Sequence, residues 1–329
     1  MRSFKNRIRW KRLILVLIPL ILLPASGFVY EWIASERAQS AYPMPGKLVD
    51  VGTFRLHMNI ARSTGPTIIF EAGSGETSLN WRSIPRDLAP YATVVSYDRA
   101  GYGWSEPSPN PRTGDNIVRE LHHALSQEGL TGPYILVGHS LGGMYMRLFA
   151  QTYPEETAAL VLVDAREENN ERESLAVLTS ETISEQPSPS LLTLLKRSGM
   201  MRLFQDELLE GFVPKEDRDI FINIVATSAF FNAKANEANL ASLTENAIRG
   251  QSLGAIPVRI IARGIPEDGR QYGLSETAGA KLELIWQNGQ RRQLALSSDS
   301  RLFIAEKSGH DIMRTEPQLI IDVIKSLLP

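Results

Sequence analysis

The chain has 329 residues, of which 43% are hydrophobic and 22% are charged, so it can bury a large core in one domain with an insertion or in two smaller domains. Its formal net charge of −2 gives no electrostatic footprint for nucleic acid. The absence of cysteine excludes disulfides, thiolate metal sites and a cysteine nucleophile.

The amino-terminal residues have the pattern of a membrane anchor. Residues 1–12 carry only basic charges, and residues 13–30 carry none, which is the short end of the about 20 residues that span a bilayer. The positive-inside rule places 1–12 in the cytoplasm and predicts a single-pass transmembrane signal anchor at 13–30 with an extracytoplasmic catalytic domain. Secretion after signal cleavage is the alternative, although the small residues at 25–27 and 38–40 are poorly placed for it.

Strand-like and helix-like segments alternate after a linker predicted at 31–46. Apolar or β-branched runs predict strands at 47–51, 53–60, 67–72, 93–98, 134–137, 159–164, 258–262 and 301–306. Helical patterns lie at 81–88, 116–128 (with Asp115 as the expected N-cap), 144–150, 276–296 and 317–328.

This alternation predicts an α/β fold with a mostly parallel sheet of about eight strands and helices on both faces. The alternation stops between 165 and 250, where the sequence has several helical patterns. We predict that this segment is an inserted helical lid and that 47–164 and 251–329 form the core. Chemistry in such sheets gathers at the carboxyl ends of the strands. Ser140, Asp164 and His310 each follow a predicted strand.

The motif Gly138-His139-Ser140-Leu141-Gly142 follows an apolar strand and opens a helix, which is the pattern of a nucleophile elbow. The sharp turn holds the serine in a strained conformation, and the two glycines lack the Cβ atoms that would collide there. We therefore predict that Ser140 is a catalytic nucleophile. The alternative is a glycine-rich turn whose serine only caps the helix.

A serine hydroxyl needs an oriented base, and His310 is the best placed of the five histidines. His139 lies inside the elbow, His122 and His123 lie in an earlier helix, and His57 belongs to an amino-terminal strand. Only His310 occupies a loop directly after a late strand.

The acid that orients this base has two candidate positions. Asp164 ends the strand after the nucleophile strand, whereas Glu267 and Asp268 lie in the loop after the next strand. Either position can bring a carboxylate to the imidazole. The alternative roles are a capping carboxylate for Asp164 and a solvated turn for the other two.

Acyl transfer also requires donors for the oxyanion. The backbone N–H of Leu141 is one. The second comes from the small-residue loop Gly73-Ser74-Gly75, where we assign Ser74, with Gly73 as the alternative.

The order of these motifs, and the run Tyr97-Asp98-Arg99-Ala100-Gly101-Tyr102-Gly103-Trp104-Ser105-Glu106-Pro107, resemble the α/β-hydrolase fold superfamily over about 47–164 and 256–328. The resemblance implies an esterase-like serine hydrolase that needs no metal or cofactor. Members that carry the acid after the strand following the nucleophile match Asp164, which favours the triad Ser140, Asp164 and His310. Two departures are Ala72-Gly73 in place of a His-Gly dipeptide, and the pair Glu267-Asp268 where an aspartate is common.

The sequence therefore predicts a serine hydrolase for a small-molecule carboxylic ester or amide. An aminopeptidase, a thioesterase or an acyltransferase could use the same residues, and Ser140 in place of an aspartate argues against dehalogenase and epoxide hydrolase chemistry. A ligand receptor on a hydrolase scaffold is the alternative of another class. The large apolar side chains of the lid suggest an apolar pocket or simply helix packing, and the oligomeric state is left open.

Overall fold

The computed structural model describes residues 25–38, 40–181 and 187–329. It divides into two compact units, one formed by 1–43 with 187–231 and the other by 44–186 with 232–329. All the predicted site residues belong to the second unit.

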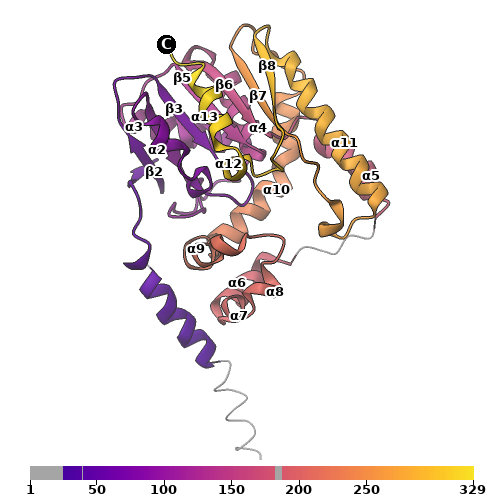
Figure 1. Ribbon diagram of the computed structural model, residues 1–329. Coiled ribbons are helices and arrows are strands. Elements are labelled where there is room, and N and C mark those ends of the chain that lie inside the picture. Colours follow the sequence, from indigo (N-terminus) through magenta and orange to yellow (C-terminus); the bar gives the residue numbers. More distant parts are fainter. Residues whose placement is uncertain (1–24, 39, 182–186) are drawn as a thin grey trace, which may run out of the picture. The chain divides into compact units, whose positions relative to one another are not determined.

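The second unit contains an eight-stranded sheet in the order β1-β2-β4-β3-β5-β6-β7-β8 (Figure 1). β1 and β2 pair antiparallel with each other, β2 pairs antiparallel with β4, and every other neighbouring pair is parallel. The predicted mostly parallel sheet is confirmed. The strands are β1 (Lys47–Asp50), β2 (Arg55–Ala61), β3 (Thr67–Glu71), β4 (Thr93–Tyr97), β5 (Tyr134–His139), β6 (Thr157–Val163), β7 (Val258–Arg263) and β8 (Ser300–Ala305).

The central strands are buried along almost their whole length because helices cover both faces of the sheet. Successive residues of one strand therefore enter different cores: Ile69 and Leu136 belong to one hydrophobic cluster, whereas Ile68 and Ile135 belong to the other. The first cluster is completed by α3 (Gly114–Gln127) and α4 (Leu141–Thr152), and the second by α2 (Ile84–Leu88), α12 (Ile312–Thr315) and α13 (Pro317–Lys325).

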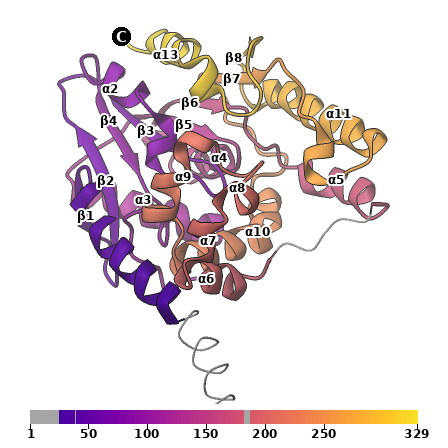
Figure 2. The same cartoon turned by 60° about the horizontal axis from the view of Figure 1, so that its bottom comes forward.

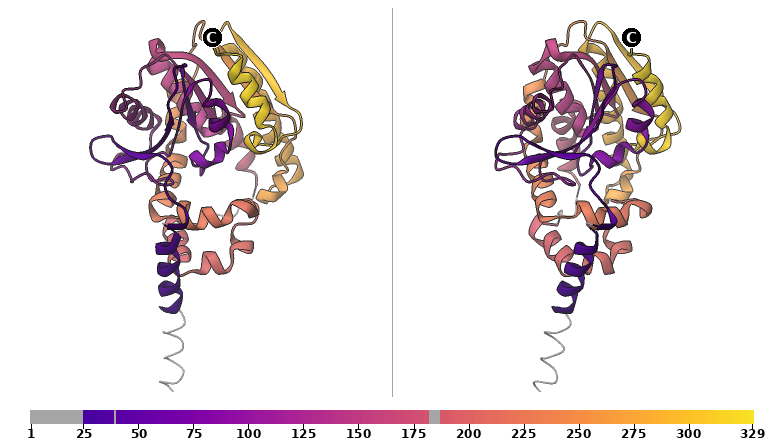
Figure 3. Two further views of the ribbon diagram at one scale, coloured as in Figure 1. Left: turned by 60° about the vertical axis from the view of Figure 1, so that its left-hand side comes forward. Right: turned by 90° about the vertical axis from the view of Figure 1, so that its left-hand side faces the viewer.

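Helices α2 and α13 contact each other on one face of the sheet (Figure 2), and Figure 3 shows α13, in yellow, along that face. Helices α5 (Asn170–Leu178) and α11 (Glu276–Arg292) also belong to this unit and pack together. Helix α10 (Ser228–Ile248) begins in the first unit and continues in the second. Helix α3 starts earlier than expected, because Thr113 rather than Asp115 is its N-cap and accepts a hydrogen bond from the Asn116 N–H.

The first unit is helical. Residues 25–38 form a helix, although 31–46 were predicted as a linker. Buried Glu31 on this helix pairs with Lys196 and Arg202, and these two contacts hold it to α6 (Pro189–Arg197) and α7 (Met200–Leu203). The unit also contains α8 (Gln205–Leu208) and α9 (Arg218–Ile220). Residues 187–231 lie within the predicted insertion, and their action as a lid stays a prediction.

The predicted membrane anchor requires a correction. In the part of the chain that the structure describes, none of the helices has the length and apolar character needed to cross a bilayer. This finding contradicts the transmembrane signal anchor and the single-pass location inferred from 13–30. Residues 13–24 lie outside the described residues, and the helix that includes 25–30 continues through the charged residues Glu31, Glu36 and Arg37.

Candidate active site

Ser140 sits between β5 and α4 in a strained backbone conformation, with φ of 51° and ψ of −121°. The neighbouring glycines make this turn possible. A Cβ on Gly138 would lie 2.6 Å from the Gly143 Cα, and a Cβ on Gly142 would lie 2.4 Å from the Ala72 carbonyl oxygen. Positive φ is unfavourable for any residue with a side chain, so the surrounding packing must impose it. The local geometry is that of a nucleophile elbow.

Asp164 and His310 come together although they are far apart in the sequence. His310 Nδ1 lies 2.6 Å from Asp164 Oδ2. Asp164 directly follows β6 and is fully buried, and His310 lies in the loop after β8. Burial alone would raise the pKa of Asp164, but the hydrogen bond and charge of His310, with Arg263 and Trp286, lower it to about 2. The carboxylate is therefore ionised at neutral pH and can orient the imidazole.

Ser140 is tied to both sides of Asp164 through its backbone. Its N–H donates to the carbonyl of Val163 at 3.1 Å, and its carbonyl accepts from the N–H of Arg166 at 3.0 Å. Within the described residues, the Ser140 hydroxyl makes no hydrogen bond to His310. Catalytic hydrogen bonds are often longer in a substrate-free site and close when substrate binds.

The two alternative acids lie elsewhere. Asp268 is exposed, pairs with Arg270 and caps a short 3-10 helix through the Arg270 N–H. The Glu267 carboxylate accepts a hydrogen bond from the Tyr272 hydroxyl at 3.3 Å. Neither carboxylate contacts His310, so the geometry brings only Asp164 to the imidazole.

Sequence reasoning missed two residues that hold Asp164. Arg263 Nη1 donates to Asp164 Oδ2 at 2.9 Å, and its backbone N–H donates to Oδ1 at 3.2 Å. The indole N–H of Trp286, on α11, donates to Oδ1 at 3.0 Å. The one available signal was Arg263 at the end of a strand that is apolar apart from Arg259, because such a buried charge needs a partner.

We expect Trp286→Phe to destabilise the protein by about 1.5–3 kcal/mol, because the buried Asp164 carboxylate loses a charge-assisted hydrogen bond. Urea denaturation at pH 7 measures this change. Trp32→Phe, at an exposed tryptophan, is the matched control. Equal free energies of unfolding for the two variants would show that the hydrogen bond contributes nothing.

The loop after β3 offers backbone donors near the elbow. The Gly73 N–H donates to the Glu76 carboxylate at 2.7 Å, and the Gly73 carbonyl accepts from the Glu76 N–H at 3.3 Å. Gly75 has a φ of 78°, as the third position of a type II turn requires. The Gly73 amide is therefore occupied. Among the described residues, the amides of Ser74 and Leu141 have no partner.

His139, which sequence analysis set aside, connects this loop to the loop of His310. Its Nδ1 lies 2.8 Å from Glu76 Oε2, and its Nε2 lies 3.0 Å from the backbone carbonyl oxygen of His310. Both partners are acceptors, so both ring nitrogens carry a proton and the imidazole is cationic. Burial opposes this charge, but the Glu76 carboxylate raises the pKa of His139 to about 9, and His139 in turn lowers the pKa of Glu76 to about 2.

Arg99 fixes the same loop from the other side. Its guanidinium donates to the carbonyls of Ala72 at 2.6 Å and Gly73 at 2.8 Å. It is fully enclosed between the carboxylates of Glu71 and Glu237, the latter from α10. The buried guanidinium therefore has two carboxylates and two backbone carbonyls as hydrogen-bond partners. These contacts hold the loop after β3 in one conformation.

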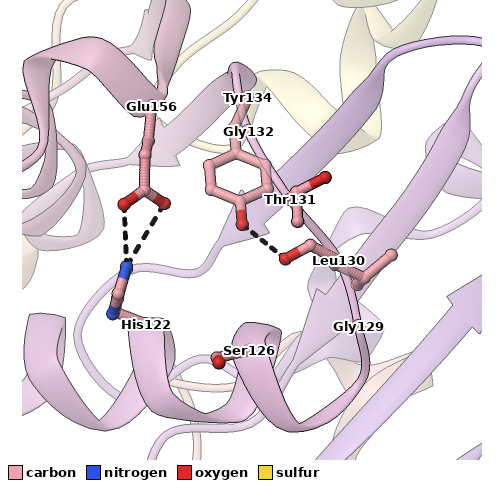
Figure 4. Close-up of a pocket in the computed structure, with 8 residues that line it drawn as sticks. All are labelled: His122, Ser126, Gly129, Leu130, Thr131, Gly132, Tyr134 and Glu156. Atoms are coloured by element: carbon pink, nitrogen blue, oxygen red, sulfur yellow. Dashed lines mark hydrogen bonds and ion pairs between the residues drawn. The ribbon is translucent and has the colours of Figure 1, made fainter.

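The other histidines lie away from Ser140. His57 is buried against Asp98, and His123 is near Gln127. His122 pairs with Glu156 in a pocket lined by His122, Ser126, Gly129, Leu130, Thr131, Gly132, Tyr134 and Glu156 (Figure 4). Tyr134 begins β5 whereas Ser140 follows its end. The pocket therefore lies at the amino-terminal ends of the strands, opposite the carboxyl ends where Ser140 lies. No three histidine, aspartate or glutamate side chains in the described part of the chain come together to hold a metal ion.

Comparisons with known proteins agree with this architecture. Residues 66–238 match the family model for the alpha/beta hydrolase fold. A protein named probable transporter efuK from Hormonema carpetanum is 28% identical over 306 residues, which are 84% of this chain but only 42% of that protein. An AB hydrolase superfamily protein from Gibberella zeae is 26% identical over 279 residues, 80% of this chain and 86% of that protein.

Solved structures show the same fold at low sequence identity. An epoxide hydrolase from Bacillus megaterium superposes with a TM-score of 0.61 at 18% identity, covering 85% of this chain and 99% of that one. This likeness concerns the fold alone. The family model spans more than half of the chain and agrees with the sheet topology, and we conclude that the chain belongs to the α/β hydrolase fold family.

Proposed function

We propose that the chain is a serine hydrolase that cleaves a carboxylic ester or amide through an acyl-enzyme intermediate. The observation that carries the proposal is the 2.6 Å contact between His310 and the buried Asp164 carboxylate beside a strained serine elbow. Asp164 holds the imidazole so that Nε2 is free to accept a proton. His139 also lies at the elbow, but Glu76 and the His310 carbonyl occupy both of its ring nitrogens, so it has no nitrogen free to accept a proton.

The reaction follows from these positions. Ser140 Oγ attacks the carbonyl carbon while His310 Nε2 takes its proton, and the negative oxygen that forms accepts hydrogen bonds from the amides of Ser74 and Leu141. The tetrahedral species collapses, the leaving group takes the proton from His310, and an acyl-Ser140 ester remains. A water molecule, deprotonated by His310, then attacks this ester and releases the acid.

Labelling with a fluorophosphonate tests the proposal. We expect a covalent adduct on Ser140 of the folded protein, because only an activated serine attacks the phosphorus at a useful rate. Intact-mass and peptide mass spectrometry identify the site. Ser140→Ala should abolish the adduct, and Ser298→Ala, at an exposed serine, should retain it. Folded wild-type protein that stays unlabelled would contradict a hydrolytic role for Ser140.

A further inference from the structure

We propose that Lys234 binds a permanent negative charge of the substrate, a carboxylate, at the turn formed by Ser74 and Gly75. This inference rests on the proposed function and specifies its substrate class as esters or amides that also carry an anionic group. Three features support it: the position of Lys234 beside Gly75, its lack of a hydrogen-bond acceptor among the described residues, and the pairing of the nearby carboxylates with other cations.

Lys234 extends from α10 along the face of Gly75. A Cβ built on Gly75 would lie 3.3 Å from Lys234 Cε and 3.4 Å from Nζ. The end of the side chain therefore rests against the glycine, in the space that a larger residue would fill. Gly75 also needs its positive φ of 78°, so a glycine meets two requirements at once. The ammonium group is thereby held beside the turn whose Ser74 amide has no protein partner.

Within the described residues, no acceptor lies within hydrogen-bonding distance of the Lys234 ammonium. Burial lowers the pKa of Lys234, and no neighbouring charge offsets this effect. The side chain is nevertheless exposed to solvent, so a solute can reach it. An ammonium that is partly desolvated and lacks a counter-ion gains from an anion, whose charge would raise its pKa again.

The nearby carboxylates already form ion pairs with other cationic side chains. Glu76, in the same loop, pairs with His139, and Glu237, one turn further along α10, pairs with Arg99. Neither is free to neutralise Lys234. The ammonium lies against Gly75, the residue after Ser74. We therefore assign it to a second negative charge that the substrate carries throughout the reaction.

Esters that carry a carboxylate on the acyl side, on the alcohol side or on neither side test this assignment. Mono-4-nitrophenyl glutarate carries the charge on the acyl side and 3-carboxy-4-nitrophenyl butyrate carries it on the alcohol side, and 4-nitrophenyl butyrate is the neutral reference. We expect wild-type protein to prefer one charged ester in kcat/KM, and Lys234→Met to lower the ratio of charged to neutral by about 10-fold or more, since a charge-assisted hydrogen bond is lost. Lys234→Arg should keep most of the preference, and Lys281→Met, at an exposed lysine on α11, should leave it intact.

Two kinetic results would overturn the inference. One is a wild-type enzyme with no preference for either charged ester. The other is a Lys234→Met variant that hydrolyses charged and neutral esters with the wild-type ratio, since Lys234 would then serve the oxyanion or nothing at all.

A binding measurement separates this inference from the hydrolytic proposal. Ser140→Ala protein should bind monomethyl glutarate more tightly than dimethyl glutarate by calorimetry, and the double variant with Lys234→Met should lose the difference. This result does not need turnover, so it stands even if the fluorophosphonate leaves Ser140 unlabelled. Equal binding of the two glutarates to Ser140→Ala would refute the anion site.

Discussion

Asp164→Asn is expected to lower kcat for 4-nitrophenyl butyrate by about 10⁴-fold with a small change in KM. The carboxylate accepts from His310 Nδ1 at 2.6 Å, whereas an amide group can present an N–H there and favour the tautomer in which Nε2 is protonated and cannot act as a base. Steady-state hydrolysis at pH 7–8 measures the effect.

Asp268→Asn is the matched control, because that carboxylate is exposed and paired with Arg270. It should retain wild-type kcat. Full activity of Asp164→Asn together with a large loss in Asp268→Asn would move the acid to the later loop.

The low pKa of Asp164 also predicts the acid stability of the fold. The folded-state pKa of about 2 lies below the ordinary value of 3.8, so the stabilisation is present above about pH 4 and is lost as the pH falls through about 2.

Glu76→Gln and His139→Gln are each expected to lower kcat by about 10²-fold, since small misplacement of reacting groups has effects of this size. The Glu76–His139 pair connects the Gly73 amide to the carbonyl of His310, so it sets the distance between the loop after β3 and His310, the proposed base. The rings of His139 and His310 are 4.6 Å apart, and the Asp164 charge also favours the protonated form of His139.

The alkaline limb of the pH profile distinguishes this positioning role from simple loss of packing. The pKa of His139 rises from 6.5 to about 9, so the contribution of the pair to stability is complete below about pH 6.5 and is lost as the pH rises through about 9. Wild-type kcat and the free energy of unfolding should both fall in that range. In Glu76→Gln the fall should begin at lower pH, because the carboxylate that raises the pKa of His139 is gone.

His122→Gln provides the control for these variants. His122 also pairs with a glutamate, Glu156, but at the opposite edge of the sheet, so its loss should leave kcat and the alkaline limb unchanged. An alkaline limb that is the same in wild-type protein and Glu76→Gln would refute a titrating His139.

Much of the fold could be predicted from the sequence because short runs of adjacent residues indicate buried strands and tight turns. The apolar runs that become β3, β4, β5 and β6 mark a sheet covered on both faces. The membrane-anchor prediction was wrong. It rested on the basic residues 1–12 and the uncharged run 13–30, whereas none of the helices in the described residues has the length and apolar character to cross a bilayer. The helix formed by 25–38 instead carries Glu31 into a buried ion pair with Lys196 and Arg202.

The sequence by itself determined where the elbow lies, since Gly138, Gly142 and the apolar strand before them mark the turn, and the surrounding packing then holds Ser140 in its strained conformation. Only the tertiary structure decided which charged groups meet there. It brings Asp164 rather than Asp268 to His310 across 146 positions, and Glu76 to His139 across 63. The physical reason is range: the patterns that mark a buried strand or a tight turn lie in adjacent residues, whereas an ion pair depends on where distant strands end in space.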